Sequence, residues 1–308
     1  MSNYYLYRIN FYLGGCTKDI EKNTKLDSYS FTESEYFHKF ENIDGLLKKI
    51  YKMNDNPHTN DYLIPFYKIL SRCKINPNKM FFVLTGDNEC INLTPSFTKN
   101  RINDNDDNKG AILRCMSFQR HWNSYYNKPR DINFENKYNK IIWRGTTTGN
   151  ENRHGNRFTL VKSWHNKNKN IDIGFSSICQ RKDNYKIYLK NYISIPDMLQ
   201  YKYIISAEGN DKDTGINWKL NSNSLVLMPK PRISSWLMET TLIPNYHYVL
   251  LADDFSDLEE KYIWCENNQS KCKEIIKNAN NFMKQFSNDT VEQIIERSVI
   301  RRYFEIYS

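Results

Sequence analysis

The chain has 308 residues, 39% hydrophobic and 14% aromatic, which is enough for one large domain or two of ordinary size. Its formal net charge of +9 comes from scattered lysines and arginines. That scatter disfavours nucleic acid as a partner and leaves a phosphorylated ligand or an anionic membrane surface. The seven cysteines form no C-x-x-C pair, which indicates reduced thiols rather than a zinc site or a disulfide framework.

The N-terminal half shows few but distinct elements. The aromatic N-terminus, MSNYYLYRINFYLGG, lacks the basic and apolar regions of a signal peptide and is expected to form a first strand. Apolar spacing predicts helices over 43–54 and 62–73, and residues 80–90 read as a strand that ends in a Gly-Asp-Asn turn. Residues 100–110 are polar and are expected to form an exposed, mobile loop. No stretch approaches the roughly 18 apolar residues of a membrane span.

From about residue 136 strands and helices alternate, which is typical of a doubly wound parallel sheet. The predicted strands are 140–144, 171–175, 203–207, 224–228 and 247–251. The predicted helices are 156–165, 195–201, 214–221 and 256–268, followed by two amphipathic helices in the tail. Because such a sheet binds ligands beyond the carboxyl ends of its strands, the residues that follow each strand are the candidates for a site.

The densest anion-binding chemistry follows the first of these strands. Arg144 to Gly149 supply an arginine, two glycines and three threonines, and Arg153 and Arg157 come before the next helix. Glycines let backbone N–H groups approach an anion, hydroxyls donate to phosphate oxygens, and arginine presents a fork of donors. The segment predicts a diphosphate cradle, although a loop of this composition also serves simply to turn the chain. It holds no G-x-x-x-x-G-K-[ST] sequence, so an ATPase P-loop is not indicated.

Two further segments carry polar candidates. Glu208 and Gly209 follow a strand, where a carboxylate beside a glycine can accept hydrogen bonds from ribose or sugar hydroxyls. Ser222–Ser224 lie at a helix–strand junction and suit a diphosphate or a sugar. A charged loop without a ligand is an equally good interpretation of this region.

Other titratable residues have mainly structural interpretations. His247 opens an apolar strand and fits a satisfied structural residue better than a base, and Ser256 with Glu259 resembles a capping box. Glu239 lies on a predicted short helix. Asp87 alone is a turn residue, but a carboxylate at a strand end also has the right chemistry to deprotonate an acceptor hydroxyl.

Taken together, these segments resemble glycosyltransferase family 90, which includes fungal capsule-associated xylosyltransferases and animal protein O-glucosyltransferases. Within that family they are most similar to the bacterial lipopolysaccharide core glycosyltransferases. The resemblance covers roughly residues 140–305, with weaker similarity at Asp87 and from Arg101 to His121. The residues that carry it are Trp143–Gly149, Arg157, Asp172–Gly174, Tyr201–Tyr203, Glu208–Asp211, Trp218, Ser222–Ser224, Met228–Pro231, Trp236, Glu239, Leu242–Val249, Ser256–Glu260, Asn278–Asn280 and Gln285–Phe286.

The resemblance implies an α/β fold of the GT-B type, with two Rossmann-like domains and a cleft between them. It implies an acceptor-side domain over 1–135, a nucleotide-sugar-binding domain over 136–285, and a helix over 286–308 that packs back on the first domain. It also implies an inverting enzyme that needs no metal or other cofactor. Such an enzyme transfers glucose, galactose or xylose from a UDP-sugar to a hydroxyl of a glycan or glycolipid, such as lipopolysaccharide core or another surface glycan.

In this scheme Asp87 is the catalytic base, and the cradle stabilises the leaving diphosphate in place of a metal. The expected donor-binding residues are Arg144, Gly145, Thr146, Thr147, Thr148, Arg157, Glu208, Gly209, Asn217, Lys219, Ser222, Asn223, Ser224 and Glu239. Family members commonly carry a basic residue in the helix after Glu-Gly-Asn-Asp, where this chain reads Gly215–Trp218. Either Lys219 substitutes for it or the diphosphate depends more on the first loop.

The composition suits a bacterial or a large-virus source equally. The expected location is the cytoplasm, at the cytoplasmic face of an anionic membrane, or a host cytoplasm. The alternative from another class is a catalytically silent nucleotide- or glycan-binding protein. Loss of the base or of the cradle arginines would mark that alternative, and both are present in this sequence.

Overall fold

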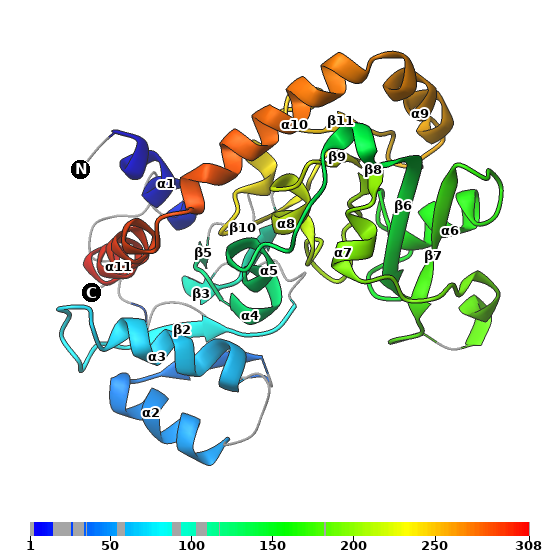
Figure 1. Ribbon diagram of the computed structural model, residues 1–308. Helices are drawn as coiled ribbons and strands as arrows, with labels where there is room; N and C mark the ends of the chain where they lie inside the picture. The colour runs from blue at the N-terminus through cyan, green and yellow to red at the C-terminus, as the bar shows by residue number, and fades with distance from the viewer. Residues whose placement is uncertain are drawn as a thin grey trace. The chain divides into compact units, whose positions relative to one another are not determined.

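The computed structural model describes residues 3–14, 26, 34, 36–53, 59–87, 94–102, 110–116, 118–181 and 183–307. The chain divides into two compact units, coloured by residue number in Figure 1. The first comprises Met1–Gln119, Arg232–Glu239 and Asn288–Ser308, and the second comprises Arg120–Pro231 and Thr240–Ser287. Residues 120–135 therefore belong to the second unit, and two later segments complete the first.

The first unit contains a mixed sheet of order β1-β2-β3-β5, in which only the β1–β2 pair is antiparallel among the described strands. A second, antiparallel pair joins β4 to β10. The predicted helices near 43–54 and 62–73 and the strand near 80–90 are confirmed. The elements are α1 (Asn3–Leu13), β1 (Phe37–Phe40), α2 (Ile43–Lys52), the π-helix η3 (Thr59–Leu63), α3 (Ile64–Leu70), β2 (Phe81–Leu84), β3 (Ser96–Thr98), β4 (Asn100–Ile102), β5 (Ala111–Leu113), β10 (Ile233–Ser235) and α11 (Asp289–Ile306).

Two expectations for this unit are wrong. The N-terminus forms helix α1 instead of a strand, because Ile9, Tyr12 and Leu13 recur at helical spacing and are buried together. The segment expected to be an exposed loop begins with strand β4, whose residue Asn100 is buried and pairs with Ser235. Residues 103–109 of that segment lie outside the described part of the chain.

A hydrogen-bonded group joins the three chain segments of the first unit. Arg8 of α1 donates to both carboxylate oxygens of Glu292 on α11, at 2.6 and 2.8 Å. The indole of Trp236 donates to the same carboxylate at 2.6 Å, and its ring stacks on Tyr12 with centroids 3.9 Å apart. A bidentate arginine–carboxylate pair that is also packed against aromatic rings fixes the orientation of the helices that carry it.

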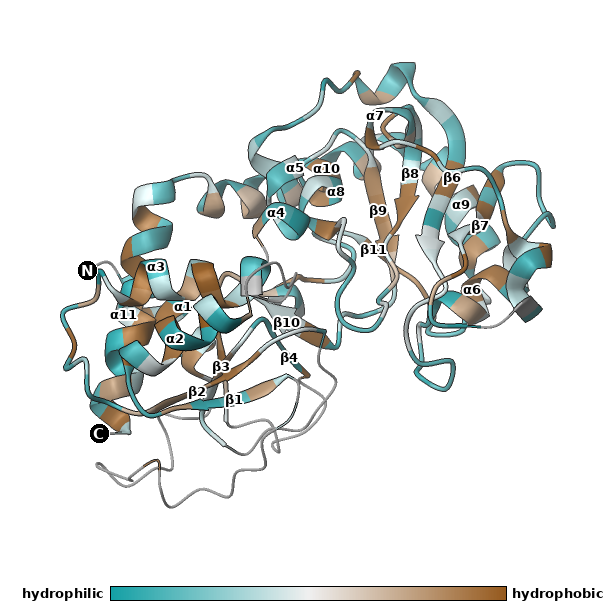
Figure 2. Ribbon diagram, turned by 90° about the horizontal axis from the view of Figure 1, so that it is seen from below, coloured by the Kyte–Doolittle hydropathy of each residue, from teal (hydrophilic) through white to brown (hydrophobic). Residues whose placement is uncertain are grey.

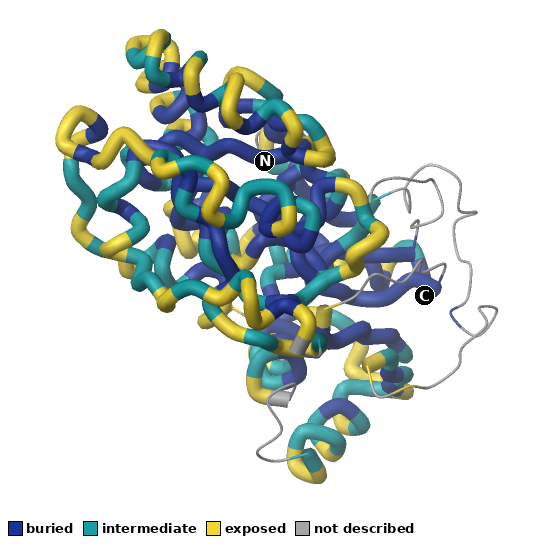
Figure 3. Tube along the Cα trace, turned by 90° about the vertical axis from the view of Figure 1, so that its right-hand side faces the viewer, coloured by how far each residue is buried: buried dark blue, intermediate teal, exposed yellow. Residues whose placement is uncertain are grey.

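The second unit is a doubly wound parallel sheet of order β11-β9-β8-β6-β7, as the alternation of strands and helices predicted. Figure 2 colours β8 and β9 of this sheet as hydrophobic, and the buried residues of the chain are dark blue in Figure 3. The elements are α5 (Asn123–Tyr126), η5 (Phe134–Asn136), β6 (Tyr138–Thr146), α6 (Arg157–Trp164), β7 (Ile171–Ser177), η6 (Asp183–Tyr188), α7 (Ile195–Met198), β8 (Tyr201–Ile205), α8 (Ile216–Leu220), β9 (Leu225–Met228), β11 (Val249–Leu250), α9 (Leu258–Asn267), α10 (Gln269–Met283) and η8 (Lys284–Phe286). Two short helices, α4 (Phe118–His121) and η7 (Glu239–Thr241), lie at the divisions between the units.

Helices cover both faces of this sheet. Successive strand residues point to opposite faces, so Ile141 and Ile142 of β6 enter different cores. Ile141 packs into the larger core with residues of α6, α9 and α10, whereas Ile142 packs into a smaller core with α7 and with Trp218 of α8. Figure 1 shows α6 on one side of the strands and α7 and α8 on the other.

The helices and the cysteines of the described residues bear on two expectations from the sequence. No helix within the described residues is long and apolar enough to cross a bilayer. The five described cysteines are all free thiols, as the lack of paired spacing led us to expect, and Cys16 and Cys90 lie outside the described residues.

Candidate functional site

The strand order of the second unit defines a place for a ligand. Strand β6 has β7 on one side and β8 on the other, and the helices that follow β6 and β8 cover opposite faces of the sheet. In an open α/β sheet the connections diverge at such a switch and leave a crevice at the carboxyl ends of the strands. The loops 147–156 and 206–215 leave the sheet at this point.

The two loops are in backbone contact through glycines. A Cβ atom on Gly149 would lie 2.8 Å from the carbonyl oxygen of Gly209, and Gly149 has a φ of +108°, which favours glycine. The N–H of Gly149 donates to Oδ1 of Asn210 at 2.8 Å. These contacts bring together the two segments that the sequence marked as separate candidates.

Arg157 lies against this contact. Its Nη1 donates to the hydroxyl of Thr148 at 2.7 Å, and a Cβ atom on Gly209 would come within 2.8 Å of its Cζ. The side chain is 9% exposed, because it opens helix α6 and turns back toward the strand ends. Its guanidinium group therefore presents charge at the switch point from a nearly buried position.

Two more arginines reach the same glycines. Arg153 Nη1 donates to the carbonyl of Gly209 at 3.2 Å, and Arg181 Nη2 donates to the carbonyl of Gly149 at 2.6 Å. Glu151, 3.3 Å from Arg181 Nε, is a carboxylate close to this group. The sequence pattern marks Arg153 as one of two arginines at or before the start of α6 but does not mark Arg181. The strand-end rule could have found Arg181, which follows the carboxyl end of β7.

Two of the expected cradle residues bond to β7 or to the segment directly after it. Arg144 donates through Nη2 to both carboxylate oxygens of Asp172 on β7, at 3.0 and 2.9 Å, and through Nη1 to the Asp172 carbonyl. The buried Thr147 exchanges hydrogen bonds of 2.6 and 2.7 Å with the backbone of Cys179.

Gly145 is needed for packing, since a Cβ there would lie 2.6 Å from the ring of Trp143. Thr146 Oγ1 lies 3.4 Å from Thr148 Oγ1.

The charge of Lys219 is compensated by a buried carboxylate. Its ammonium group forms an ion pair with Asp213 and donates to the carbonyl of Ile205 at 3.0 Å. Burial alone would raise the pKa of Asp213, but the charge and hydrogen bond of Lys219 outweigh it and hold that pKa below its usual value. Nearby, the amide Nδ2 of the buried Asn217 has no hydrogen-bond partner among the described residues. An unpaired buried donor close to the switch point is suited to meet a bound polar group.

Of the remaining candidates in the second unit, Ser222–Ser224 lie away from the two glycines, whereas Glu208 directly precedes Gly209. Ser222–Ser224 precede β9 at the amino end of the sheet, and Ser224 Oγ donates to the carbonyl of Tyr201, the first residue of β8, at 2.7 Å. Asn223 is held there by the backbone of Ile132. Glu208 directly follows the buried Ala207 and is partly exposed.

Asp87 and Glu239 belong to the first unit. Asp87 follows β2 and forms an ion pair with Lys99, whose side chain is 2% exposed, so the carboxylate is held in place at the strand end. Glu239 is buried and accepts from the backbone and hydroxyl of Ser235 at 2.6 and 2.7 Å. Those bonds give Glu239 a role in closing the turn after β10.

The capping box expected at Ser256 and Glu259 is not formed. Asp257 occupies the N-cap position of α9, and Ser256 bonds to Asp254 instead, at 2.6 Å. Glu259 accepts from the amide of Asn168 at 2.7 Å. The sequence pattern does not form the capping box because Glu259 bonds to Asn168, which is remote in the sequence, instead of capping its own helix.

His247 shows the geometry of a structural residue, and this leads to a pH prediction. Its Nδ1 accepts from the N–H of Ile243 at 2.8 Å, and burial lowers its pKa. The unfolded chain therefore binds a proton on this histidine at a higher pH than the native protein does. The contribution of the neutral His247 to the free energy of unfolding is complete above about pH 6.5 and is lost as the pH falls below that value. When the pH is lowered from about 7.5 to 5.5, we expect the melting temperature of the His247→Asn variant to fall less than that of wild type. The exposed His154→Asn variant serves as the control and should follow wild type; equal losses in all three proteins would contradict the prediction.

The fold is that of an α/β protein in which arginines and two glycines come together at the carboxyl ends of β6 and β8. Residues 117–305 match the Glycosyl transferase family 90 model. The chain is 35% identical over 222 residues to O-glucosyltransferase LpsA of Dichelobacter nodosus, covering 72% of this chain and 65% of that protein. It is 23% identical over 250 residues to the uncharacterized protein 179R of Invertebrate iridescent virus 6, covering 71% of this chain and 21% of the viral protein.

A further similarity is to the uncharacterized protein 035R of Invertebrate iridescent virus 3, at 25% identity over 49% of this chain and 15% of that protein. The chain thus spans less than two thirds of the length of each of these relatives. Because the family match extends over more than half of the sequence, the chain belongs to glycosyltransferase family 90.

Proposed function

We propose that this chain is a glycosyltransferase that holds the diphosphate of a UDP-sugar at the carboxyl ends of β6 and β8. The observation that carries the proposal is the contact of Gly149 with Gly209 at the strand switch, with three arginines around it. Glycine backbones admit an anion closely, and guanidinium groups match phosphate oxygens with paired donors. The diphosphate then depends on Arg157 and the first loop, since Lys219 is engaged by Asp213.

The proposed reaction is a direct displacement with inversion. The acceptor hydroxyl attacks the anomeric carbon as Asp87 takes its proton, and the bond to the diphosphate breaks with its electron pair on the leaving oxygen. The arginines offset the charge that develops there, in place of a metal ion. The assignment of Asp87, the GT-B arrangement of two Rossmann-like domains, and the independence from metal rest on the family resemblance.

The donor and acceptor follow from the same resemblance. The printed name of the bacterial relative is an O-glucosyltransferase, which favours glucose over galactose or xylose as the transferred sugar. We propose a hydroxyl of lipopolysaccharide core or of another surface glycan as the acceptor, reached from the cytoplasm at an anionic membrane face. The net charge of +9 would support such contact.

Thermal unfolding with a panel of nucleotides tests the donor assignment. UDP, UDP-glucose, UDP-galactose and UDP-xylose are each expected to raise the melting temperature by about 3 to 5 °C at a hundredfold excess over their dissociation constants. GDP-sugars should give smaller shifts. No stabilisation by any nucleotide would overturn the proposal. Stabilisation by UDP-sugars without any transfer would favour the catalytically silent alternative.

A further inference from the structure

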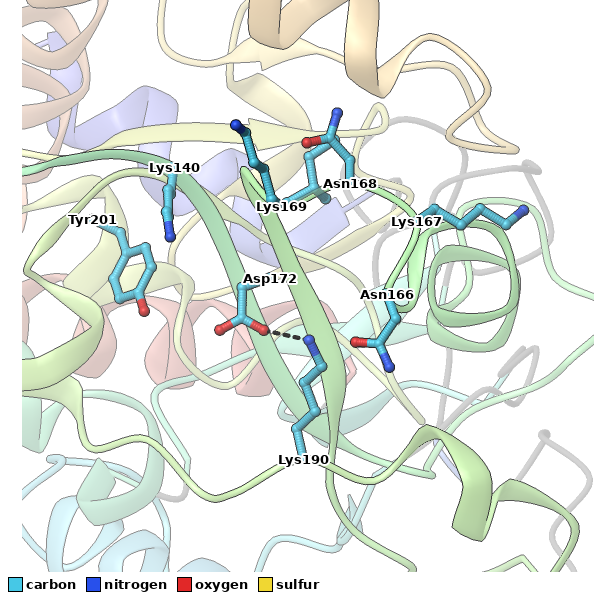
Figure 4. A pocket seen from close by; sticks show the side chains of 9 residues that line it. Lys140, Asn166, Lys167, Asn168, Lys169, Asp172, Lys190 and Tyr201 are labelled. Carbon is cyan, nitrogen blue, oxygen red and sulfur yellow. Dashed lines mark hydrogen bonds and ion pairs between the residues drawn. The ribbon is translucent and has the colours of Figure 1, made fainter.

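A pocket lined largely by lysines lies at the opposite end of the same parallel sheet from the loops 147–156 and 206–215. This pocket of about 340 Å³ is lined by residues at or before the amino ends of β6, β7 and β8, together with Lys190, whose side chain reaches in from the segment after η6. Figure 4 shows Asp172 and Lys190 joined at its centre, with Tyr201 on one side and Asn166 on the other. The full lining is Lys140, Asn166, Lys167, Asn168, Lys169, Ile171, Asp172, Lys190 and Tyr201. None of these residues belongs to the loops 147–156 and 206–215.

The one carboxylate in the lining is already neutralised. Asp172 accepts two hydrogen bonds from Arg144 and a third, of 2.7 Å, from Lys190. Burial would raise the pKa of Asp172, but these bonds outweigh it and lower the pKa, so the group stays ionised and paired. Gly174 makes this pairing possible, because a Cβ there would lie 2.7 Å from the aliphatic chain of Lys190.

The other lysines of the lining lack such compensation. Within the described part of the chain, no carboxylate forms an ion pair with Lys140, Lys167 or Lys169. The loop that carries two of them is held in shape, since Asn168 Oδ1 accepts from the N–H of Asn170 at 2.8 Å and its amide donates to Glu259. Lys140, Lys167 and Lys169 are exposed, and three ammonium groups beside one cavity without a carboxylate ion pair attract an anion.

We propose that this pocket binds a phosphate group, and that it is an anion site separate from the loops that follow β6 and β8. Ammonium groups bind phosphate as point charges, and the phenol of Tyr201 supplies a hydroxyl donor. The volume lies within the range of about 300 to 1,000 Å³ for small-molecule sites, so it holds a phosphate ester rather than only a bare ion. The phosphate comes either from a lipid headgroup or from a soluble phosphorylated sugar. This inference does not depend on the proposed donor.

Calorimetric titration of the full chain with inorganic phosphate and with glycerol 3-phosphate tests the proposal at fixed ionic strength. Saturable binding to one site is expected. Lys140→Glu combined with Lys169→Glu should weaken it at least about tenfold, because two attractive charges become repulsive. Lys140→Arg with Lys169→Arg should retain it. The matched control is Lys128→Glu with Lys277→Glu, an equal change of charge at exposed lysines of the same unit outside the pocket.

Several outcomes would overturn the proposal. These are the absence of saturable binding, equal weakening by the control pair, or loss of binding in Arg157→Ala together with competition by UDP. The last result would place the phosphate at the loops after β6 and β8. Phosphate binding that depends on Lys140 and Lys169 in a protein that does not bind UDP would support this site while the donor proposal fails.

Vesicles distinguish the two sources of the phosphate. Sedimentation with vesicles of phosphatidylcholine and phosphatidylglycerol, but not of phosphatidylcholine alone, supports a lipid headgroup if it is lost in the Lys140→Glu, Lys169→Glu protein. Binding of the soluble probes without any vesicle binding supports a soluble phosphorylated sugar.

Discussion

Replacing Arg157 with alanine is expected to remove most of the stabilisation that UDP gives to the protein. The guanidinium group lies between Thr148 and Gly209 at the strand switch and is nearly buried. A charge-assisted hydrogen bond in such a place contributes about 2 kcal/mol, so the affinity for UDP should fall roughly 30-fold. The measurement is the difference in melting temperature with and without UDP, which separates binding from any loss of stability in the variant itself.

Three companion variants sharpen this test. Arg157→Lys keeps the charge but not the paired donors and should give an intermediate loss. The exposed Arg130→Ala is the control and should respond to UDP like wild type. Arg144→Ala removes a partner of Asp172 and should mainly lower stability. If Arg144→Ala loses the UDP response while Arg157→Ala keeps it, the diphosphate lies nearer Arg144, as the sequence alone suggested.

Asp87→Asn is expected to abolish sugar transfer while leaving the UDP response intact. Asparagine has nearly the same shape as aspartate but cannot accept the proton of the acceptor hydroxyl, and loss of a general base costs roughly a hundred- to ten-thousandfold in turnover. Release of UDP from the donor that stabilises best, with lipopolysaccharide as the acceptor, measures turnover. Because the ion pair between Asp87 and Lys99 is lost, some loss of melting temperature is expected as well.

The control for this variant is Asp44→Asn, a change of the same kind at an exposed position in the first turn of α2. It should leave turnover unchanged. Retained turnover in Asp87→Asn would move the base elsewhere, with Asp211 and Glu239 as the next candidates to test. Loss of UDP binding together with turnover would show that Asp87 supports the donor site instead.

Much of the second unit could be predicted because its signals are local. Each strand predicted between residues 140–144 and 247–251 is present in the structure as a strand of the parallel sheet. Apolar runs bounded by polar loops identify buried strands without reference to the rest of the chain. The N-terminal helix was misread because its aromatic composition is equally compatible with a strand. Its buried face is determined by Glu292 and Trp236, which are remote in sequence.

The candidate site was predictable only in part. The loop from Arg144 to Gly149 was marked by composition, but composition could not show that Arg144 bonds to β7 while Arg157 turns toward Gly209. Arg181 is marked only by its place after the carboxyl end of β7, and Ser222–Ser224 have suitable chemistry at the other end of the sheet. The direction in which a side chain points depends on the strand order, which neighbouring residues in the sequence do not specify.

Family membership, the parallel αβ alternation of the second unit and the segments rich in anion-binding groups can be read from the sequence, because they depend on residue types and spacing along one stretch of chain. The sequence does not show that Gly149 meets Gly209, that Lys219 pairs with Asp213, or that a separate lysine pocket surrounds the paired Asp172. Each of these features is a contact between segments that lie apart in the sequence, and such contacts exist only in the folded chain.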